Sequence, residues 1–309
     1  MASFHIPRTS AHFSWNRDLP AALTVDPGAT VTLEVANASG GQFGADASVE
    51  DVARLDFSRV NPVTGPILVR GAEPGDSLVV EVLSIDLDSW GWTANIPGFG
   101  LLADEFETPH LRISNVSEHA AELLPGLRIP VVPFIGTIGV ALAAKGEHPI
   151  VPPSPQGGNM DVRHITPGAR LHLPVAVPGA LLSLGDTHAA QGDGEVCGTA
   201  IETSSAVTVR LHLEKGAARP YPLVETHPRS ARHGRAIATT GIAPDLLQAA
   251  RAATRGMIDE IVRRTGLSPL DAYLLASVAG DLKISEVVDA PNWVVSMHLE
   301  QDLLAGGAG

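Results

Sequence analysis

The sequence is poor in cysteine, in basic residues and in long apolar runs. One cysteine in 309 residues leaves no partner for an intrachain disulfide and excludes a cluster of thiolate ligands. Lys and Arg number 21 against 34 Asp and Glu, and this net charge of −13 disfavours nucleic acid as a partner. No apolar stretch approaches the roughly 20 residues that span a bilayer, and residues 1–7 do not resemble a signal peptide. These absences predict a cytoplasmic protein with no nucleic-acid and no membrane partner.

Several catalytic motifs are also missing. The sequence contains no G-x-S-x-G nucleophile elbow, no phosphate-binding loop and no dinucleotide-binding G-x-G-x-x-G after a strand. It also lacks the long Gly-Ser-rich run of amidases that use a Ser–Ser–Lys triad. Serine-based hydrolysis and nucleotide chemistry are therefore disfavoured.

Glycine and proline are abundant, with 31 and 24 residues, and this composition suits many short strands joined by tight turns. Alternating apolar residues predict strands within residues 23–36 and 77–87. Helical spacing becomes convincing only after residue 243, in residues 244–265 and 268–278. The sequence therefore predicts a mainly β fold with a small α/β layer (α+β), its helices concentrated near the C-terminus. We expect a single domain, 1–309, which could divide into two β-rich subdomains of about 1–148 and 149–309.

Residues 185–198 combine three carboxylates, one imidazole, one carboxamide and four glycines. They follow an apolar run, 171–184, that is typical of buried β-structure. A core strand that opens into such a loop delivers polar groups to one end of a sheet, and glycine lets the backbone approach a ligand closely. The alternative is an acidic hairpin turn. The density of polar groups favours a functional site.

Asp186 and His188 are two residues apart, so a regular strand places both on one face. A carboxylate beside an imidazole suits Zn²⁺ or a similar divalent ion. A catalytic zinc site needs about three protein ligands. The third predicted ligand is Asp161, which follows a Gly-Gly turn, with Asp193 in reserve.

Glu195 is the predicted proton carrier of this site, because a carboxylate near a metal can take a proton from water and return it to a leaving group. Glu202 is the second choice, since its odd spacing from Glu195 predicts the opposite strand face. Alternatively, Glu195 caps backbone amides in the glycine turn. Cys197 is a rival nucleophile, although a cysteine between Val196 and Gly198 is typical of a small apolar core residue.

Residues 90–102 are rich in glycine and aromatic residues and predict an irregular loop of the kind that often acts as a lid. Trp92 is the residue that we expect to limit the size of the substrate. The remaining histidines considered are predicted to be structural or solvated: His164, His172, His227 and His233.

The motifs together identify a resemblance. Residues 157–161 (Gly-Gly-Asn-Met-Asp) and residues 179–195, which end in Gln-Gly-Asp-Gly-Glu, resemble the acetamidase/formamidase family. Residues 62–66, 71–76 and 280–289 follow the same pattern. The resemblance runs from about residue 20 to residue 300.

The resemblance implies a β-rich, homo-oligomeric and metal-dependent amidohydrolase that releases ammonia and a carboxylate from short linear amides. It places Asn159, Asp161, Asp186 and His188 in the pocket, together with the residues of the last motif: Gln191, Asp193 and Glu195. We expect Gln191 and Asn159 to orient the amide by hydrogen bonds.

Two alternatives to this activity stay open. One is a related hydrolase of a larger or cyclic amide, and the other is a non-catalytic relative that binds metal or amide. Zinc is the ion that the histidine favours, whereas an oxygen-rich shell would also suit Ca²⁺, Mn²⁺ or Mg²⁺.

Overall fold

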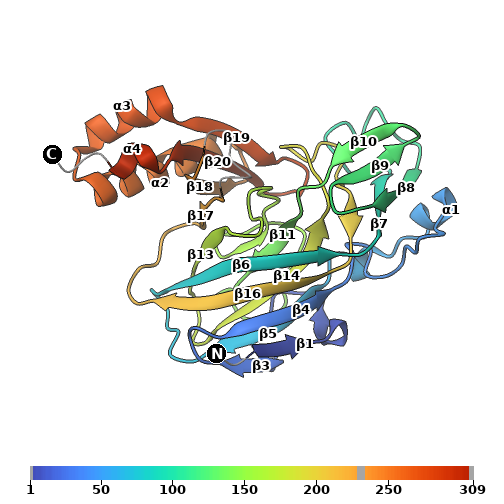
Figure 1. Cartoon of the computed structure of the whole chain (residues 1–309), viewed down its shortest axis with the longest axis horizontal. Helices are drawn as coiled ribbons and strands as arrows, with labels where there is room; N and C mark the ends of the chain where they lie inside the picture. Colours follow the sequence, from blue (N-terminus) through green and yellow to red (C-terminus); the bar gives the residue numbers. More distant parts are fainter. Residues whose placement is uncertain (1–2, 228–233, 306–309) are drawn as a thin grey trace.

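The computed structural model describes residues 3–227 and 234–305. It confirms a mainly β architecture whose longer helices lie near the C-terminus, at one end of the view in Figure 1. The first sheet has the strand order β1 (Ser3–Ile6), β4 (Thr30–Val35), β16 (Ser205–Glu214), β6 (Ser77–Leu87), β13 (Arg170–Pro174), β17 (Leu223–Glu225), β18 (Ala236–Ala243), β20 (Trp293–Glu300) and β19 (Asp281–Glu286).

The second sheet carries the acidic loop. Its strand order is β10 (Leu127–Pro130), β9 (Ala120–Leu124), β8 (His110–Val116), β7 (Trp90–Asn95), β15 (Glu202–Thr203), β14 (Ala180–His188), β11 (Phe134–Gly139) and β12 (Gly157–Asn159). Strand β5 (Val63–Val69) pairs with β14 and also with β2 (Ala11–His12) and β3 (Leu23–Val25).

The main core lies between the two sheets. In β4 the residues alternate between buried and half-buried, as the period-2 pattern predicts, and Val31, Leu33 and Val35 are fully enclosed. They belong to one apolar cluster with Ile67 of β5 and Leu184 of β14. Strand β14 is buried at every position. The strand therefore carries the polar side chains of Asp186, Thr187 and His188 into the interior at its C-terminal end.

The C-terminal layer is built by helices whose ends follow the expected capping signals. Helix α2 (Leu246–Thr265) begins after Asp245, whose side chain accepts a hydrogen bond from the Gln248 amide at 2.8 Å, and ends at Gly266. Helix α3 (Pro269–Ala279) begins after Ser268. The buried face of α2 packs against β18 and β20 in a separate apolar cluster. The shorter helices are α1 (Val49–Val52), α4 (Asp302–Ala305) and the 3₁₀ turns η1 (Arg8–Ser10) and η2 (Phe57–Arg59).

The prediction of a loop over residues 90–102 is wrong for its first half. Trp90–Asn95 is strand β7, which pairs with β8 along its whole length and with β15 at Trp92. The segment begins with a large, a small and a large side chain, Trp90, Gly91 and Trp92, and the glycine obscured this strand pattern. Trp92 is therefore a buried wall residue and does not lie in a lid.

Glu260 of α2 is a buried carboxylate at the centre of an ionic cluster with three arginines. Its carboxylate accepts hydrogen bonds from Arg219 at 2.7 Å, from Arg263 at 2.5 Å and from Arg264 at 3.2 Å. Burial alone would raise the pKa of Glu260, but the hydrogen bonds from Arg263 and Arg219 outweigh burial and lower the pKa to about 2.

We expect the substitution Glu260→Gln to lower the free energy of unfolding by about 1–2 kcal/mol at neutral pH, because it removes the buried negative charge that Arg219, Arg263 and Arg264 share. A carboxylate whose pKa is lowered by folding stabilises the fold above its ordinary pKa of 4.5, and this stabilisation is lost as the pH falls toward 2. Urea unfolding at a series of pH values should show the difference from wild type shrinking below about pH 4.5. Asp259→Asn, at the exposed neighbouring position, is the control. A deficit as large at pH 3 as at pH 6 would contradict this account.

Candidate active site

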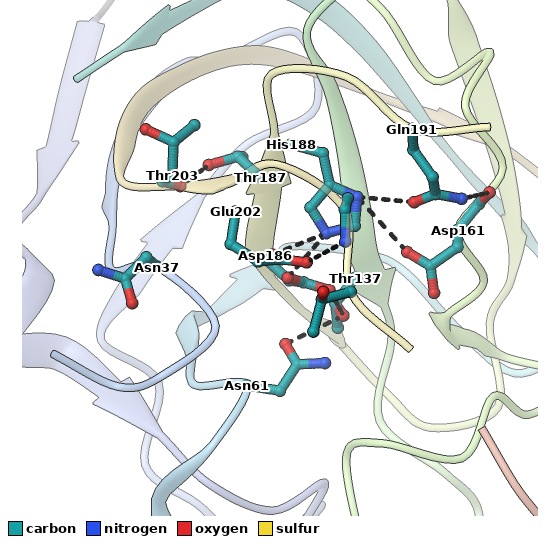
Figure 2. A network of polar contacts seen from close by, with 12 residues as sticks. Asn37, Asn61, Thr137, Asp161, Asp186, Thr187, His188, Gln191, Glu202 and Thr203 are labelled. Atoms are coloured by element: carbon teal, nitrogen blue, oxygen red, sulfur yellow. Dashed lines mark hydrogen bonds and ion pairs between the residues drawn. The ribbon is translucent and has the colours of Figure 1, made fainter. Parts of the chain in front are cut away.

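The site is built at the end of β14. Asp186 and His188 lie on one face of this strand, as their spacing predicts, with His188 Nε2 3.0 Å from Asp186 Oδ1 (Figure 2). Both side chains are buried, at 5% and 1% exposure. Burial alone would lower the pKa of His188, but the carboxylates of Glu202 and Asp186 outweigh burial and raise it well above its ordinary value. The same ion pair outweighs burial at Asp186 and lowers its pKa.

Gln191 holds the imidazole from the other side. Its Oε1 is 2.8 Å from His188 Nδ1, and its Nε2 donates to the backbone carbonyl of Asp161 at 3.2 Å. The ring of Phe134 packs edge-on against the imidazole at a centroid distance of 4.9 Å. Because an amide oxygen accepts only, Nδ1 carries the proton in this contact, and Nε2 is directed toward the carboxylates.

Asp161 supplies the third predicted group. Its Oδ1 lies 3.8 Å from His188 Nδ1, and neither carboxylate oxygen has a hydrogen-bond partner among the described residues. Burial, opposed by the charge of His188 and reinforced by that of Asp186, raises the pKa of Asp161 to about 8. A buried carboxylate without a donor is costly unless a cation satisfies it. The structure thus brings together all three ligands of the predicted metal site.

Gly136 on β11 leaves the space in which these three side chains meet. A β-carbon at this position would lie 2.6 Å from Asp161 Oδ1, 2.9 Å from Asp186 Oδ2 and 2.9 Å from the imidazole Cε1 of His188. Any side chain at residue 136 would therefore occupy the room next to the carboxylate oxygens. This cradle fits a small cation.

Glu202 reaches the site by strand pairing. It lies on β15 directly opposite His188 on β14, and its Oε2 is 3.0 Å from His188 Nε2. Directly opposed residues of an antiparallel pair share a face, so Glu202 lies on the same face as His188. The spacing between Glu195 and Glu202, from which we predicted the opposite face, does not determine this position. The other oxygen accepts a hydrogen bond from the Ala200 amide at 2.7 Å. Burial raises the pKa of Glu202 to about 7 although the charge of His188 opposes it.

Glu195 and Asp289 complete the cluster. Glu195 has an oxygen within 4.8 Å of donor atoms of His188 and Glu202, and also of donor atoms of Asp161 and Asp289. Burial, reinforced by the charge of Asp161, raises the pKa of both Glu195 and Asp289 well above their ordinary values. The residue-by-residue analysis missed Asp289. The only signal was its position at the end of the motif over residues 280–289.

A network of neutral side chains holds two of the carboxylates by hydrogen bonds. Asn159 donates to Asp289 Oδ2 at 2.7 Å, and its carbonyl oxygen accepts hydrogen bonds from Asn61 and Thr137. Thr137 also contacts Asp186 Oδ2 at 3.2 Å. Asn159 therefore lies within the predicted pocket, with its oxygen already engaged by protein donors.

Three of the acidic residues have an unusual backbone. Asp161, Asp186 and Glu195 have φ angles of 48°, 53° and 47°, the left-handed region that side-chain-bearing residues seldom adopt. Such conformations cost about 1–3 kcal/mol each and persist where the surroundings enforce them, often at functional sites. The strained backbone at these three residues therefore directs their carboxylates toward one another.

The other predicted residues lie away from this cluster. Asp193 is exposed and belongs to none of the described groups that could hold an ion. Cys197 is half-buried, and its thiol contacts the Thr199 carbonyl at 3.3 Å. Of the histidines, His164 packs against His298 at a ring distance of 4.6 Å, and His172 lies 3.5 Å from a carboxylate oxygen of Glu214. His233 is outside the described residues.

Two cavities meet at Glu195. The smaller one, with a volume of about 60 Å³, is lined by Asp186, Glu202, Asp289 and Trp92 among others. Trp92 is held by a hydrogen bond from its indole nitrogen to Asn37 at 3.2 Å. The larger cavity, about 490 Å³, reaches Glu195 past Gln191 and Cys197. We call the smaller cavity the chamber.

Comparisons with known proteins agree with the fold. The profile of the Acetamidase/Formamidase family matches residues 3–147 and 141–305. The crystal structure of an acetamidase from Bacillus halodurans is similar at 32% identity over 99% of this chain and 100% of that chain, with a TM-score of 0.90. A formamidase from Methylophilus methylotrophus is 29% identical over 96% of this chain and 91% of its own length. A γ-lactamase from Delftia acidovorans is similar at 28% identity and a TM-score of 0.70, over 96% of this chain and 89% of that chain.

The fold and these similarities place the chain among the amide hydrolases. The chain belongs to the Acetamidase/Formamidase family, as its motifs predict.

The substitution Asp161→Asn should stabilise the protein when divalent ions have been removed, because an amide in place of a buried, unpaired carboxylate relieves repulsion and can donate hydrogen bonds. We expect a gain of roughly 1–3 kcal/mol in chelated protein, measured by thermal unfolding. Folding raises the pKa of Asp161 from 3.8 to about 8, so the chelated wild type should lose stability as the pH rises through this range. The variant should lose less. Asp193→Asn is the control, and a destabilised Asp161→Asn protein under chelation would contradict the prediction.

Proposed function

We propose that the protein is a metal-dependent hydrolase of short linear amides, which cleaves the C–N bond to give ammonia and a carboxylate. The observation that carries this proposal is the convergence of Asp161, Asp186 and His188 next to Glu195, in a cluster from which Asp186 and Glu195 line the chamber. An amide is a poor electrophile, so its hydrolysis needs a polarised carbonyl, an activated water and an acid for the departing nitrogen. The site holds groups suited to each task.

Asp161, Asp186 and His188 would hold the ion. Their donor atoms lie within 4.8 Å of one another, and Gly136 leaves the necessary room. Both oxygens of Asp161 lack hydrogen-bond partners in the part of the chain that the structure describes. One imidazole with carboxylates suits zinc, and the oxygen-rich surroundings would also accept Mn²⁺, Mg²⁺ or Ca²⁺. When bound, the ion supplies Lewis acidity toward the carbonyl and lowers the pKa of water.

Glu195 is the proton carrier in this proposal. It lines the chamber, is buried, and lies beside His188 and Asp161. Its carboxylate takes a proton from the attacking water as the C–O bond forms, and then delivers that proton to the nitrogen as the C–N bond breaks. Ammonia leaves, and the acyl group leaves as the carboxylate. Glu202 is placed to hold His188 through their 3.0 Å contact, with no proton transfer of its own required.

Asn159, Gln191 and Trp92 have supporting roles. Gln191 fixes the orientation of His188, as its contacts favour. The Asn159 side chain fixes Asp289 and lines the chamber beside the position where the amide would bind. Trp92 forms part of the chamber wall and excludes water. Asp193 is left outside the proposed ligand set because it is exposed.

Glu195→Gln should lower kcat for acetamide by about 10²–10⁴-fold, because the amide cannot carry the proton, while the bound ion is retained. Ammonia release measures the first effect and elemental analysis of the purified variant the second. Asp193→Asn removes a carboxylate from the same loop and should change kcat by less than about twofold. A Glu195→Gln protein that has lost its ion would show that Glu195 is a ligand, and the assigned roles would then be wrong.

Chelation should abolish ammonia release from formamide, acetamide and propionamide, and one added ion should restore it. The restoring ion identifies the metal. Release that continues after chelation, with no metal found by elemental analysis, would refute the metal-dependent mechanism.

Hydrolysis of a cyclic amide is the second candidate, and the similarity to the γ-lactamase of Delftia acidovorans favours it. Opening of γ-butyrolactam gives an amino acid without free ammonia. Product analysis by chromatography therefore separates this activity from that on linear amides.

The cellular setting and the assembly of the protein stay predictions. No helix among the described residues is both long and apolar enough to cross a membrane. Helix α3 leaves large apolar side chains in solvent, with Val278 84% and Leu270 68% exposed. Association into the predicted homo-oligomer would cover such a surface.

A further inference from the structure

The chamber has a polar floor and an apolar wall. We call the polar part of its lining the floor, which includes Asn61, Asn159 and the carboxylates of Asp186, Glu195, Glu202 and Asp289. We call the apolar part the wall, which is aliphatic and aromatic and includes Ala38, Leu55, Phe57, Trp92, Ile96 and Phe99. A buried amide group needs hydrogen-bond partners, which the wall cannot provide. An amide substrate therefore binds with its amide group toward the floor and its acyl carbons against the wall.

The volume of the chamber limits the size of the acyl group. Its 60 Å³ gives room for about four to six non-hydrogen atoms, at roughly 10–15 Å³ for each water-sized position. Formamide would fill part of this space and leave the wall without a contact. A long or aromatic acyl group would exceed it.

Phe57 and Phe99 form the rim of the chamber. Phe57 is 52% exposed, so it lies where the chamber opens to solvent, and its ring meets that of Phe99 edge-on at 6.3 Å. Phe99 in turn rests on the backbone of Gly198, where a β-carbon would lie 2.4 Å from its ring. Gly198 has a φ of 87°, which favours glycine. The ring of Phe99 is therefore confined between Gly198 and Phe57 and sets the far limit of the chamber.

We propose that the apolar wall is an acyl pocket closed by Phe99. It selects acetamide, propionamide and butyramide over formamide on the one side and over longer or aromatic amides on the other. The inference rests on the proposed amide hydrolysis and adds the chain length of the substrate. Phe99 acts in it as a specificity-determining residue.

The wild-type profile is the first test. Because each buried methylene strengthens binding by roughly fourfold, kcat/KM should rise from formamide to propionamide and then fall steeply for hexanamide and benzamide. Ammonia release from the metal-loaded protein gives this profile. A wild type that prefers formamide, or that hydrolyses hexanamide as well as propionamide, would overturn the inference.

Substitutions at the wall are the second test. Phe99→Ala should raise the ratio of kcat/KM for hexanamide to that for propionamide by about tenfold or more, because the ring no longer closes the chamber. Ala38→Leu fills the chamber and should shift preference in the opposite direction, toward formamide. Phe106→Ala is the matched control, since Phe106 lies in the same part of the chain, is 58% exposed and is absent from the wall. Near-ultraviolet circular dichroism and thermal unfolding check that each variant is folded.

The outcomes distinguish the inference from the function on which it rests. Release of ammonia with the same chain-length profile in wild type, Phe99→Ala and Ala38→Leu would overturn the acyl pocket and leave amide hydrolysis intact. If the wild type releases no ammonia from any amide, the proposed function fails, and calorimetric titration of the same amides then measures the profile without turnover. Binding that peaks at propionamide and moves to hexanamide in Phe99→Ala would support the pocket. Binding that does not depend on chain length would overturn it.

Discussion

The burial of several carboxylates around one imidazole is the constraint on which the rest of this structure depends. Asp161, Asp186, Glu195, Glu202 and Asp289 are all nearly excluded from water. Their mutual repulsion and lost hydration oppose folding, and His188 offers a single positive charge in return. The large core between the two sheets offsets this cost. The rigid strands that build that core also hold the carboxylates at separations that free side chains would avoid.

Strand pairing and neutral donors determine which oxygens remain available. Glu202 faces His188 because β15 pairs with β14, and Asn159 and Thr137 attach Asp289 and Asp186 to strands β12 and β11. Each of these contacts removes freedom from a carboxylate without neutralising it. The oxygens of Asp161 are left without donors from residues 3–227 and 234–305. This arrangement suits a bound ion or a reacting water. A carboxylate whose oxygens already accept hydrogen bonds from the protein would gain little by binding either one.

Local signals in the sequence predicted the parts of the fold and site that depend on local geometry. The pairing of Asp186 with His188 follows from a spacing of two residues, and helix α2 follows from apolar residues at helical spacing. Contacts between distant segments could not be predicted in this way. Asn159 and Asp289 are 130 residues apart, and no spacing relates them. The wall of the chamber could not be predicted from local signals either, because Leu55, Phe57 and Phe99 come from turns and loops with no periodic pattern.

The strained backbone at Asp161, Asp186 and Glu195 has a thermodynamic consequence for the whole chain. A ligand that binds only the folded state adds stability in proportion to the logarithm of its free concentration. Any cation that satisfies these carboxylates binds a geometry that the unfolded chain lacks, since that geometry exists only while the surrounding strands enforce it. The fraction of folded protein then becomes a measure of the free-ion level around it. The supply of this ion would then determine the amount of folded protein as well as the amount of active protein.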